Sequence, residues 1–257
     1  MKKPLAVIKV GGRAAEPEAM KKLGSEMAAL QDRFRFLLVH GGGAEVSRIS
    51  ELFGLIPRFI DGVRLTSPEE MGVVDMVLAG KMNKDITRLL RTAGLNALGL
   101  SGSDGGLFTG EAVSAESHTG RVTEVNGTTL EVLLEGGFVP VVSSTSMEEG
   151  GKPLNINADQ AALALAAAHP AAVLLFLSDI PGVLTGPFLD RVIPRLNREA
   201  IARDIKDGTI TGGMIPKVNS ALEALDRGVG AVVIGQYNDS GDLSALLSGG
   251  KGTRIEK

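Results

Sequence analysis

The chain has 257 residues, a formal net charge of −3 at pH 7 and no cysteine. Hydrophobic residues make up 44% and charged residues 22%, which is typical of a globular protein and argues against a disordered or fibrous chain. Lysines and arginines are spread along the chain, which argues against nucleic-acid binding. The absence of cysteine excludes disulfides, thiolate metal sites and cysteine nucleophiles, and it is compatible with a reducing cytoplasm, where we expect the protein.

The first residues, "MKKPLAVIKVGG", place two lysines before an apolar run, as a signal peptide does. Lys9 interrupts that run, so we predict a strand at this position instead. The longest apolar stretch, residues 161–177, is interrupted by His169-Pro170 and is shorter than the roughly 20 residues that a membrane-spanning helix needs. We therefore predict no membrane segment.

Short apolar runs alternate with longer helical patterns along the whole chain. The runs predict strands at 5–10, 34–40, 96–100, 138–144, 171–178 and 230–235. The segments between them predict helices at 16–32, 43–54, 67–93, 127–136, 159–168, 197–207 and 216–228. Because these strands are apolar on both faces, helices should cover both sides of a mainly parallel sheet, which is an α/β sandwich.

Two segments depart from this alternation. The helix predicted at 67–93 is long enough to cover either the core or a second subunit. Residues 107–127 are rich in glycine, serine and threonine, and predict a hairpin outside the sheet that could fold over a ligand. His169-Pro170 is the one plausible boundary between two halves of the chain. We therefore expect lobes at 1–169 and 170–257 that share one sheet.

Glycine clusters follow several of the predicted strands, at residues 11–12, 41–43, 102–106 and 182. Each cluster alone is compatible with a tight turn. Since the carboxyl ends of parallel strands lie at one edge of a sheet, the clusters together predict an anion-binding rim of backbone N–H groups. The chain contains neither G-x-x-x-x-G-K-[ST] nor a strand-to-helix G-x-G-x-x-G, so a phosphate site here must be of another kind.

Two lysines and a polar cluster lie near this predicted rim. Lys9 ends the first strand, and Lys217 lies in the first turn of a helix, where its charge opposes the helix dipole. Each could be an ordinary surface lysine, but a nearby anion would explain both. Asn155, Asn157 and Asp159 precede an apolar helix, and because one residue suffices as a cap, at least one of them is available to a ligand.

These residues lie in motifs that resemble the amino acid kinase family, and within it the N-acetyl-L-glutamate kinases. The resemblance extends from Lys9 to Ile255, and "ITGGMIPKV" with "NINADQAA" is its most specific part. The motifs are "IKVGG" (8–12), "VHGGG" (39–43), "GVRLT" (62–66), "SDGG" (103–106), "NINADQAA" (155–162), "SDIPGVL" (178–184), "ITGGMIPKV" (210–218) and "GTRI" (252–255).

The resemblance implies an open αβα sandwich with an N-terminal acceptor lobe and a C-terminal ATP lobe. It implies that Lys9 and Lys217 stabilise the transferring phosphoryl group and that Asp159 orients both lysines. The other implied roles are acceptor binding by Gly42, Gly43, Arg64 and Asn155, phosphate contacts from the backbone of Gly11, Gly12 and Gly43, and nucleotide binding by Asp179, Ile180, Pro181, Gly182, Val183, Leu184, Thr209, Ile210 and Thr211.

The implied reaction moves the γ-phosphoryl group of ATP to the γ-carboxylate of N-acetyl-L-glutamate, as in arginine biosynthesis. A carboxylate with a pKa of about 4.3 is already ionised at pH 7, so no general base is needed. Charge neutralisation is needed, and the lysines, Mg²⁺ held mainly by the ATP phosphates, and glycine N–H groups would supply it. Asp159 could separate the lysines or contact Mg²⁺ through water, and both possibilities remain open.

Two rival functions use the same fold. A kinase of lysine biosynthesis that acts on a carrier-linked aminoadipate or glutamate would share the catalytic residues, and a silent ligand sensor would bind without turnover. The presence of Lys9, Asp159 and Lys217 together favours an enzyme. Only residues 1–4 precede the first strand, whereas arginine-inhibited members carry an extra helix there, so we expect an arginine-insensitive homodimer joined through the helix at 67–93.

Overall fold

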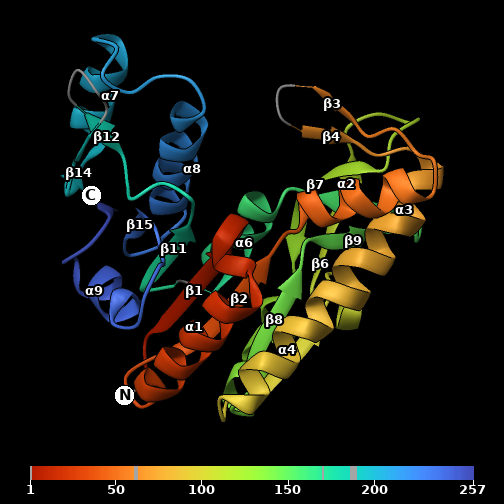
Figure 1. Ribbon diagram of the computed structural model, residues 1–257, viewed down its shortest axis with the longest axis horizontal. Coiled ribbons are helices and arrows are strands. Elements are labelled where there is room, and N and C mark those ends of the chain that lie inside the picture. Colours follow the sequence, from red (N-terminus) through yellow and green to blue (C-terminus); the bar gives the residue numbers. More distant parts are fainter. Residues whose placement is uncertain (1, 61–62, 170, 186–189) are drawn as a thin grey trace.

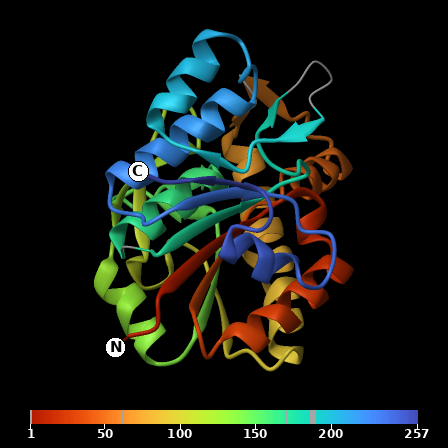
Figure 2. The ribbon, with the colours of Figure 1, turned by 90° about the vertical axis from the view of Figure 1, so that its left-hand side faces the viewer.

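The computed structural model describes residues 2–60, 63–169, 171–185 and 190–257. Two layers of helices enclose a central sheet, and the N-terminal and C-terminal parts of the chain lie on opposite sides of that sheet's middle strands (Figure 1). A view turned by 90° shows the strands stacked between the helices (Figure 2). The predicted αβα sandwich is confirmed.

The central sheet has eight strands in the order β14-β16-β15-β11-β1-β2-β8-β5 within the described residues. Its six parallel strands are those that the sequence predicts. A short run of apolar residues, without alternation of apolar and polar positions, was therefore sufficient to identify each of these strands. Their bounds are β1 Leu5–Val10, β2 Arg35–His40, β5 Ala97–Leu100, β8 Val139–Ser143, β11 Val173–Leu177 and β15 Val232–Gly235.

The edge of this sheet was not predicted. β16 (Thr253–Ile255) pairs antiparallel with β15, and β14 (Arg195–Leu196) pairs parallel with β16. These strands have three and two residues and contain arginine, so they have too few apolar residues to form a recognisable run. A further two-stranded ribbon is formed by β12 (Leu184–Thr185) and β13 (Arg191–Val192).

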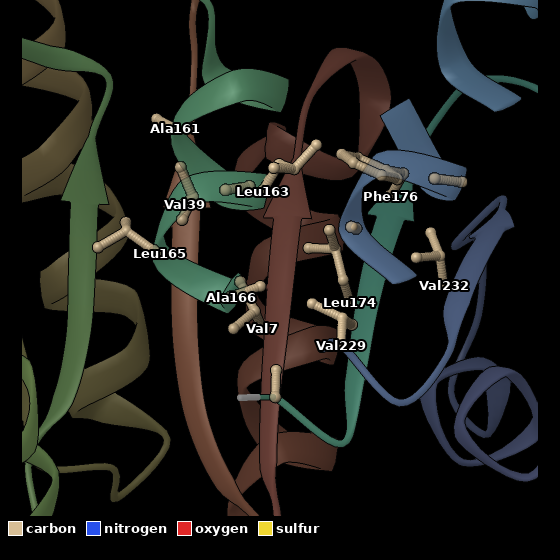
Figure 3. Close-up of a cluster of buried hydrophobic side chains, with 14 of the residues drawn as sticks. Val7, Val39, Ala161, Leu163, Leu165, Ala166, Leu174, Phe176, Val229 and Val232 are labelled. Carbon is tan, nitrogen blue, oxygen red and sulfur yellow. The ribbon is translucent and has the colours of Figure 1, made fainter. Parts of the chain in front are cut away.

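Successive side chains of β1 point to opposite faces of the sheet and so contribute to two separate halves of the core. Leu5 and Val7 belong to a buried cluster with α6 and α8, whereas Ala6, Ile8 and Val10 belong to a second buried cluster with α1, α4 and α9. Figure 3 shows α6 lying against β1, β2 and β11, with side chains of the first cluster such as Val7, Val39 and Leu174 between them. Because side chains alternate between the two faces of each strand, both faces of the sheet are apolar, and helices cover both.

The predicted helices are all present, with ends shifted by a few residues. One helix, α9, was not predicted, because its seven residues give a weak pattern. The bounds are α1 Pro17–Leu30, α2 Gly43–Leu52, α3 Pro68–Asp75, α4 Asn83–Thr92, α5 Gly127–Glu135, α6 Ala158–Ala168, α7 Arg198–Lys206, α8 Met214–Asp226 and α9 Asp242–Ser248.

The single helix predicted at 67–93 is α3, a π-helical turn over Met76–Met82, and α4, which follow one another without a break. Ser67 caps α3 by accepting a hydrogen bond from the N–H of Glu70. Met76 in the π turn is 56% exposed, so part of the segment is apolar and uncovered in this chain. Its role in a dimer stays a prediction.

The hairpin predicted at 107–127 is confirmed as β6 (Phe108–Ala112) and β7 (Thr119–Val125). It belongs to a four-stranded sheet with β10 (Pro153–Ile156) and β9 (Thr145–Met147). A second hairpin, β3 (Arg58–Ile60) and β4 (Val63–Leu65), was not predicted and projects from the molecule beside α2 (Figure 1). It is this second hairpin that stands over the site described below.

The predicted boundary lies where α6 ends, but Pro170 is outside the described residues. β11, which follows this boundary, pairs with β1, so strands from both proposed lobes are neighbours in one sheet. The division into an acceptor lobe and an ATP lobe stays a prediction. Among the described residues, no helix combines the length and the apolar character needed to cross a membrane.

Candidate active site

Lys9 reaches the site because of its position in β1. It lies on the same face of the strand as Leu5 and Val7, and that face is covered by α6. Its Nζ is 2.7 Å from Oδ1 of Asp159 in the first turn of α6, and 18% of the lysine side chain is exposed. A Cβ on Gly11 would lie 2.8 Å from this Nζ, so a larger residue there would displace the end of the lysine side chain.

Asn157 is the cap of α6. Its Oδ1 accepts hydrogen bonds from the N–H groups of Asp159 at 2.8 Å and Gln160 at 3.4 Å. The prediction that one residue of the polar cluster serves as the cap is therefore confirmed. Because Asn157 fulfils this need, the carboxylate of Asp159 is available to Lys9.

Lys217 lies in the first turn of α8, as predicted, and its Nζ donates a 3.0 Å hydrogen bond to Oγ of Ser178, directly after β11. Within the described residues Asp159 forms an ion pair with Lys9 and not with Lys217. The expected role of Asp159 in orienting both lysines stays a prediction. Both lysines nevertheless line one pocket of about 160 Å³, together with Gly11, Gly12 and Asp159.

A larger cavity of about 860 Å³ adjoins this pocket and shares Lys9 and Asp159 with it. Its wall includes all four residues that the resemblance assigns to acceptor binding, namely Gly42, Gly43, Arg64 and Asn155. The sequence-predicted catalytic and acceptor residues are thus brought together from five separate segments of the chain.

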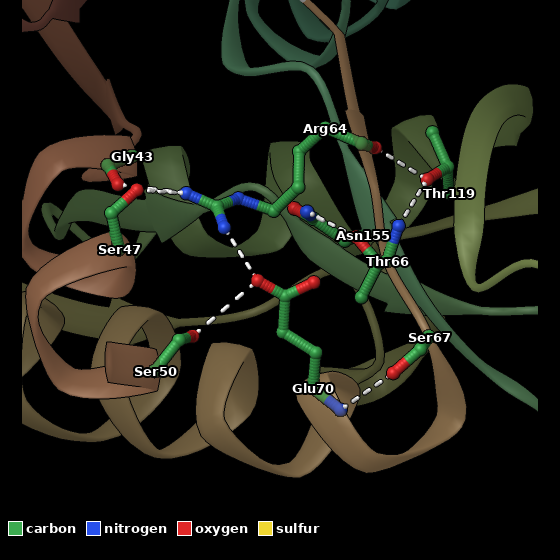
Figure 4. Close-up of polar contacts among 9 residues, drawn as sticks. All are labelled: Gly43, Ser47, Ser50, Arg64, Thr66, Ser67, Glu70, Thr119 and Asn155. Atoms are coloured by element: carbon green, nitrogen blue, oxygen red, sulfur yellow. Dashed lines mark hydrogen bonds and ion pairs between the residues drawn. The ribbon is translucent and has the colours of Figure 1, made fainter. Parts of the chain in front are cut away.

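Arg64 comes from the hairpin β3–β4 and is only 7% exposed. Figure 4 shows its guanidinium against Glu70, Ser47 and the carbonyl oxygen of Gly43. Nη1 donates to Oε1 of Glu70, and Nη2 donates to Oγ of Ser47 at 2.6 Å and to Gly43 O at 3.0 Å. Its carbon Cζ lies 4.8 Å from the centre of the Phe59 ring. Three of its five donors are therefore used within the protein, which leaves two for a ligand.

Asn155 is fixed by a chain of hydrogen bonds beside Arg64 (Figure 4). Its Nδ2 donates to Oγ1 of Thr66 at 2.9 Å, and the N–H of Thr66 donates to Oγ1 of Thr119 at 2.9 Å. The Thr119 hydroxyl in turn donates to the carbonyl oxygen of Arg64 at 2.6 Å. Because Nδ2 is occupied, the carbonyl oxygen of the Asn155 side chain is the end that can accept from a ligand N–H.

The glycines after β2 form the N-terminal end of α2. The N–H groups of Gly42, Gly43 and Ala44 have no hydrogen-bond partner within the part of the chain that the structure describes. They line the large cavity, where they can bind an anion. Glu45 also lines the cavity and stays ionised, because hydrogen bonds from Arg48 lower its pKa to about 2.

Gly12 is required by the approach of Asp179. It has φ +54°, and a Cβ there would lie 2.3 Å from Oδ2 of Asp179. The N–H of Arg13 donates to Oδ1 of the same carboxylate at 3.0 Å. Asp179, which is predicted to contact nucleotide, therefore ties the segment after β11 to the segment after β1.

The other predicted nucleotide residues do not line either cavity. Val183 and Ile210 are buried at 0% and 1% exposure, so neither faces open space in this structure. Gly182 lies against Thr253, whose hydroxyl accepts from the N–H of Val183 at 2.8 Å. The remaining predicted residues are Ile180, Pro181, Leu184, Thr209 and Thr211, which are partly or fully exposed.

Several site residues were not predicted. Ser178 stands next to Asp179 in the motif "SDIPGVL", so a hydroxyl at the strand end was an available signal. Glu70 lies in the first turn of α3, where an acidic residue is ordinary, and nothing local indicates that it is 4% exposed and paired with Arg64. Ser47 and Thr119 likewise gain their roles only from distant partners.

The fold and the site together define an α/β protein with lysines and, among the described residues, unpaired backbone N–H groups around cavities at the carboxyl edge of a mainly parallel sheet. A model of the amino acid kinase family matches residues 4–236. The chain therefore belongs to the amino acid kinase family.

Curated relatives extend over most of the chain. An acetylglutamate kinase of Methanopyrus kandleri is 42% identical over 262 residues, which cover 98% of this chain and 100% of the relative. An acetylglutamate kinase of Geobacillus kaustophilus is 40% identical over 230 residues, which cover 89% and 88% of the two chains.

Solved structures share the fold. The protein smu.665 from Streptococcus mutans superposes with a TM-score of 0.80 at 28% identity, with 98% of each chain covered. A carbamate kinase of Giardia lamblia, bound to AMP-PNP, superposes with a TM-score of 0.73 at 19% identity, with 99% of each chain covered. The second likeness is evidence for the fold alone.

Proposed function

We propose that this protein transfers the γ-phosphoryl group of ATP to the γ-carboxylate of N-acetyl-L-glutamate, giving an acyl phosphate and ADP. The observation that supports this most directly is the pocket of about 160 Å³ in which Lys9 and Lys217 meet. That pocket shares Lys9 and Asp159 with the larger cavity, whose wall includes Arg64 and Asn155. Curated acetylglutamate kinases about 40% identical over most of the chain support the same acceptor.

The chemistry requires positive charge rather than a base. The acceptor carboxylate is already ionised, and the transition state spreads negative charge over the oxygens of the transferring group. Lys9 and Lys217 would neutralise this charge from two sides, with the backbone N–H groups of Gly11, Gly12 and Gly43 as further donors. Asp159 lies 2.7 Å from Lys9, and Ser178 accepts a hydrogen bond from Lys217. The orientation of both lysines by Asp159 stays part of the proposal.

The acceptor would lie in the larger cavity. A free N–H of Arg64 suits its α-carboxylate, and the side-chain oxygen of Asn155 suits its acetamido N–H. The N–H groups of Gly42 and Gly43 face the cavity and can bind a carboxylate or phosphoryl oxygen. This arrangement favours a free, doubly charged amino acid derivative.

The nucleotide would bind on the other side of the lysines. Asp179, the segment 180–184 and the segment 209–211 are the candidates, and Val183 and Ile210 are the buried members of these segments. No group of three or more histidine, aspartate or glutamate side chains that could hold a metal is found among the described residues. Mg²⁺ would therefore arrive with the ATP phosphates and neutralise part of their charge, and Asp159 and Asp179 are the carboxylates within reach of it.

We further propose that the protein is a cytoplasmic homodimer joined through the segment 67–93 and serves arginine biosynthesis. The exposed apolar side chain of Met76 in the π turn supports a covered face there. Sedimentation of the purified chain tests the dimer, and a monomer at micromolar concentration would contradict it.

Purified protein with N-acetyl-L-glutamate, MgATP and hydroxylamine tests the reaction, because hydroxylamine converts an acyl phosphate to a coloured hydroxamate. We expect a hydroxamate that depends on both substrates and disappears in Lys217→Ala. Lys206→Ala, at an exposed lysine of α7, is the matched control and should keep its activity. Absence of hydroxamate from the free acid would favour a carrier-linked acceptor, and binding of both ligands without ADP release would favour a sensor.

A further inference from the structure

His40 and Asn83 form a buried polar pair that the reaction above does not use. His40 ends β2 and lies on the face covered by α1 and α4, because it shares that face with Phe36 and Leu38. Asn83 is the first residue of α4, directly after the π turn. Both side chains are 0% exposed, so each polar atom needs a partner.

The hydrogen bonds fix the tautomer of His40. Its Nδ1 is 2.9 Å from the carbonyl oxygen of Gly41, which can only accept, so Nδ1 carries the proton. Nε2 then accepts from Nδ2 of Asn83 at 3.1 Å. Burial lowers the pKa of His40 to about 4, so the ring is neutral at pH 7. The pair is therefore a fixed relay of two hydrogen bonds that ends on the backbone of Gly41.

The amide of Asn83 is itself held from several sides. Its Nδ2 also lies 2.8 Å from the carbonyl oxygen of Val141, and its Oδ1 accepts from Nζ of Lys84 at 2.9 Å. A Cβ on Gly99 would lie 2.2 Å from this Oδ1, so a glycine on β5 is needed for the close approach. The π turn contributes a second contact, since a Cβ on Gly42 would lie 2.1 Å from Sδ of Met82.

The geometry points to a positioning role for His40 and Asn83, which hold the loop Gly41–Gly43 so that the N–H of Gly42 faces the acceptor. In a trans peptide the C=O and the N–H point in opposite directions. Holding the carbonyl oxygen of Gly41 toward His40 therefore directs the N–H of Gly42 away from the ring, toward the cavity that Gly42 lines. This inference rests on the proposed function, because it assigns that N–H to an anionic acceptor.

Two substitutions of His40 separate this role from simple packing. Asparagine carries its amide nitrogen at the same distance along the side chain as Nδ1, and glutamine carries its nitrogen near the place of Nε2. Both remove the ring and lose similar packing. We expect His40→Gln to lower kcat/KM for N-acetyl-L-glutamate by about 10- to 100-fold, as for loss of a hydrogen bond to a charged group, and His40→Asn to stay within about fivefold of the wild type.

The KM for MgATP should stay within about twofold in both variants, because the nucleotide candidates lie on other segments. Equal losses in His40→Asn and His40→Gln, or an equal rise in the KM for MgATP, would overturn the positioning role. A wild-type protein without turnover of N-acetyl-L-glutamate would instead overturn the proposed function, so the two failures are distinguishable.

If His40→Gln does not fold, Lys84 provides a second test. Lys84 is exposed, so its replacement should leave folding intact, and its Nζ orients the Asn83 amide. We expect Lys84→Met to lower kcat/KM for N-acetyl-L-glutamate about two- to fivefold, with an unchanged melting temperature, and Lys84→Arg to restore it. A wild-type value of kcat/KM in Lys84→Met would contradict the inference.

Discussion

Replacement of Glu70 should reveal how strongly the acceptor site depends on one buried ion pair. The side chains of Arg64 and Glu70 are 7% and 5% exposed, and they are in direct contact. Removing one partner of such a pair costs roughly 3–5 kcal/mol, because the other charge stays buried without compensation. Arg64 keeps its bonds to Ser47 and Gly43, so we expect about 3 kcal/mol for Glu70→Ala.

In a chain of this length each kcal/mol shifts the melting temperature by roughly 2–4 °C, so Glu70→Ala should melt roughly 6–12 °C below the wild type. Glu70→Gln keeps an oxygen opposite Nη1 and should lose roughly 1–2 kcal/mol. Since Glu70 no longer fixes Nη1 of Arg64 in the alanine variant, we also expect about a tenfold rise in the KM for N-acetyl-L-glutamate, equivalent to about 1.4 kcal/mol.

Urea unfolding of both variants, together with steady-state kinetics, measures these effects. The matched control is Glu223→Ala, which breaks an exposed ion pair with Arg227 on α8 and should cost less than about 0.5 kcal/mol. The reasoning fails if Glu70→Ala is as stable as Glu223→Ala, or if its KM for the acceptor is unchanged. Arg64→Ala should also lose stability and raise that KM, and the double variant should be more stable than the sum of the single losses predicts.

Three further predictions follow from the site and its surroundings. Lys217→Ala should fold normally and lose a factor of about 10²–10³ in kcat. Ser178→Ala frees the ammonium group of Lys217 without removing it, so its kcat should fall less. A kcat for Lys217→Ala near the wild-type value would contradict the role of Lys217 in stabilising the phosphoryl group. Burial lowers the pKa of His40 from 6.5 to about 4, so the unfolded chain binds this proton at higher pH than the folded chain. Stability should therefore be complete above pH 6.5 and fall by up to roughly 3 kcal/mol as the pH drops to 4, and His40→Asn should show a smaller difference between pH 7 and pH 4.5 in urea unfolding. Removal of Mg²⁺ by EDTA should abolish turnover and leave the melting temperature of the free protein unchanged, and a lower melting temperature would indicate a structural metal.

The parallel core could be predicted because its signal is local. Each of the six parallel strands is a short run apolar on both faces, and each helix between them shows its own period, so no knowledge of neighbours is needed. β14, β16 and α9 lack that signal, since they are short and contain charged or small residues. Their structure depends on the sheet edge against which they lie.

Side-chain partners could not be predicted in the same way. Arg64, Lys9 and Asp159 were recognised as site residues from motifs, but Glu70 and Ser178 became evident only when α3 and β11 were placed beside their partners. A glutamate in the first turn of a helix looks the same in sequence whether it is solvated or buried.

One face of the central sheet carries Lys9 of the candidate active site, and the other carries the buried His40. The register of the strands determines which side chains lie on each face. Lys9 lies beside Val39 in the pairing of β1 with β2, and Val10 lies beside His40. Lys9 therefore shares the α6 face with Val39, and His40 shares the α4 face with Val10. Because a slip of one residue moves every side chain to the opposite face, one inserted residue within β1 would turn Lys9 away from Asp159 and toward α1. Such an insertion should abolish turnover even if the sheet still forms, whereas an insertion in the exposed turn at residues 31–33, between α1 and β2, should be tolerated.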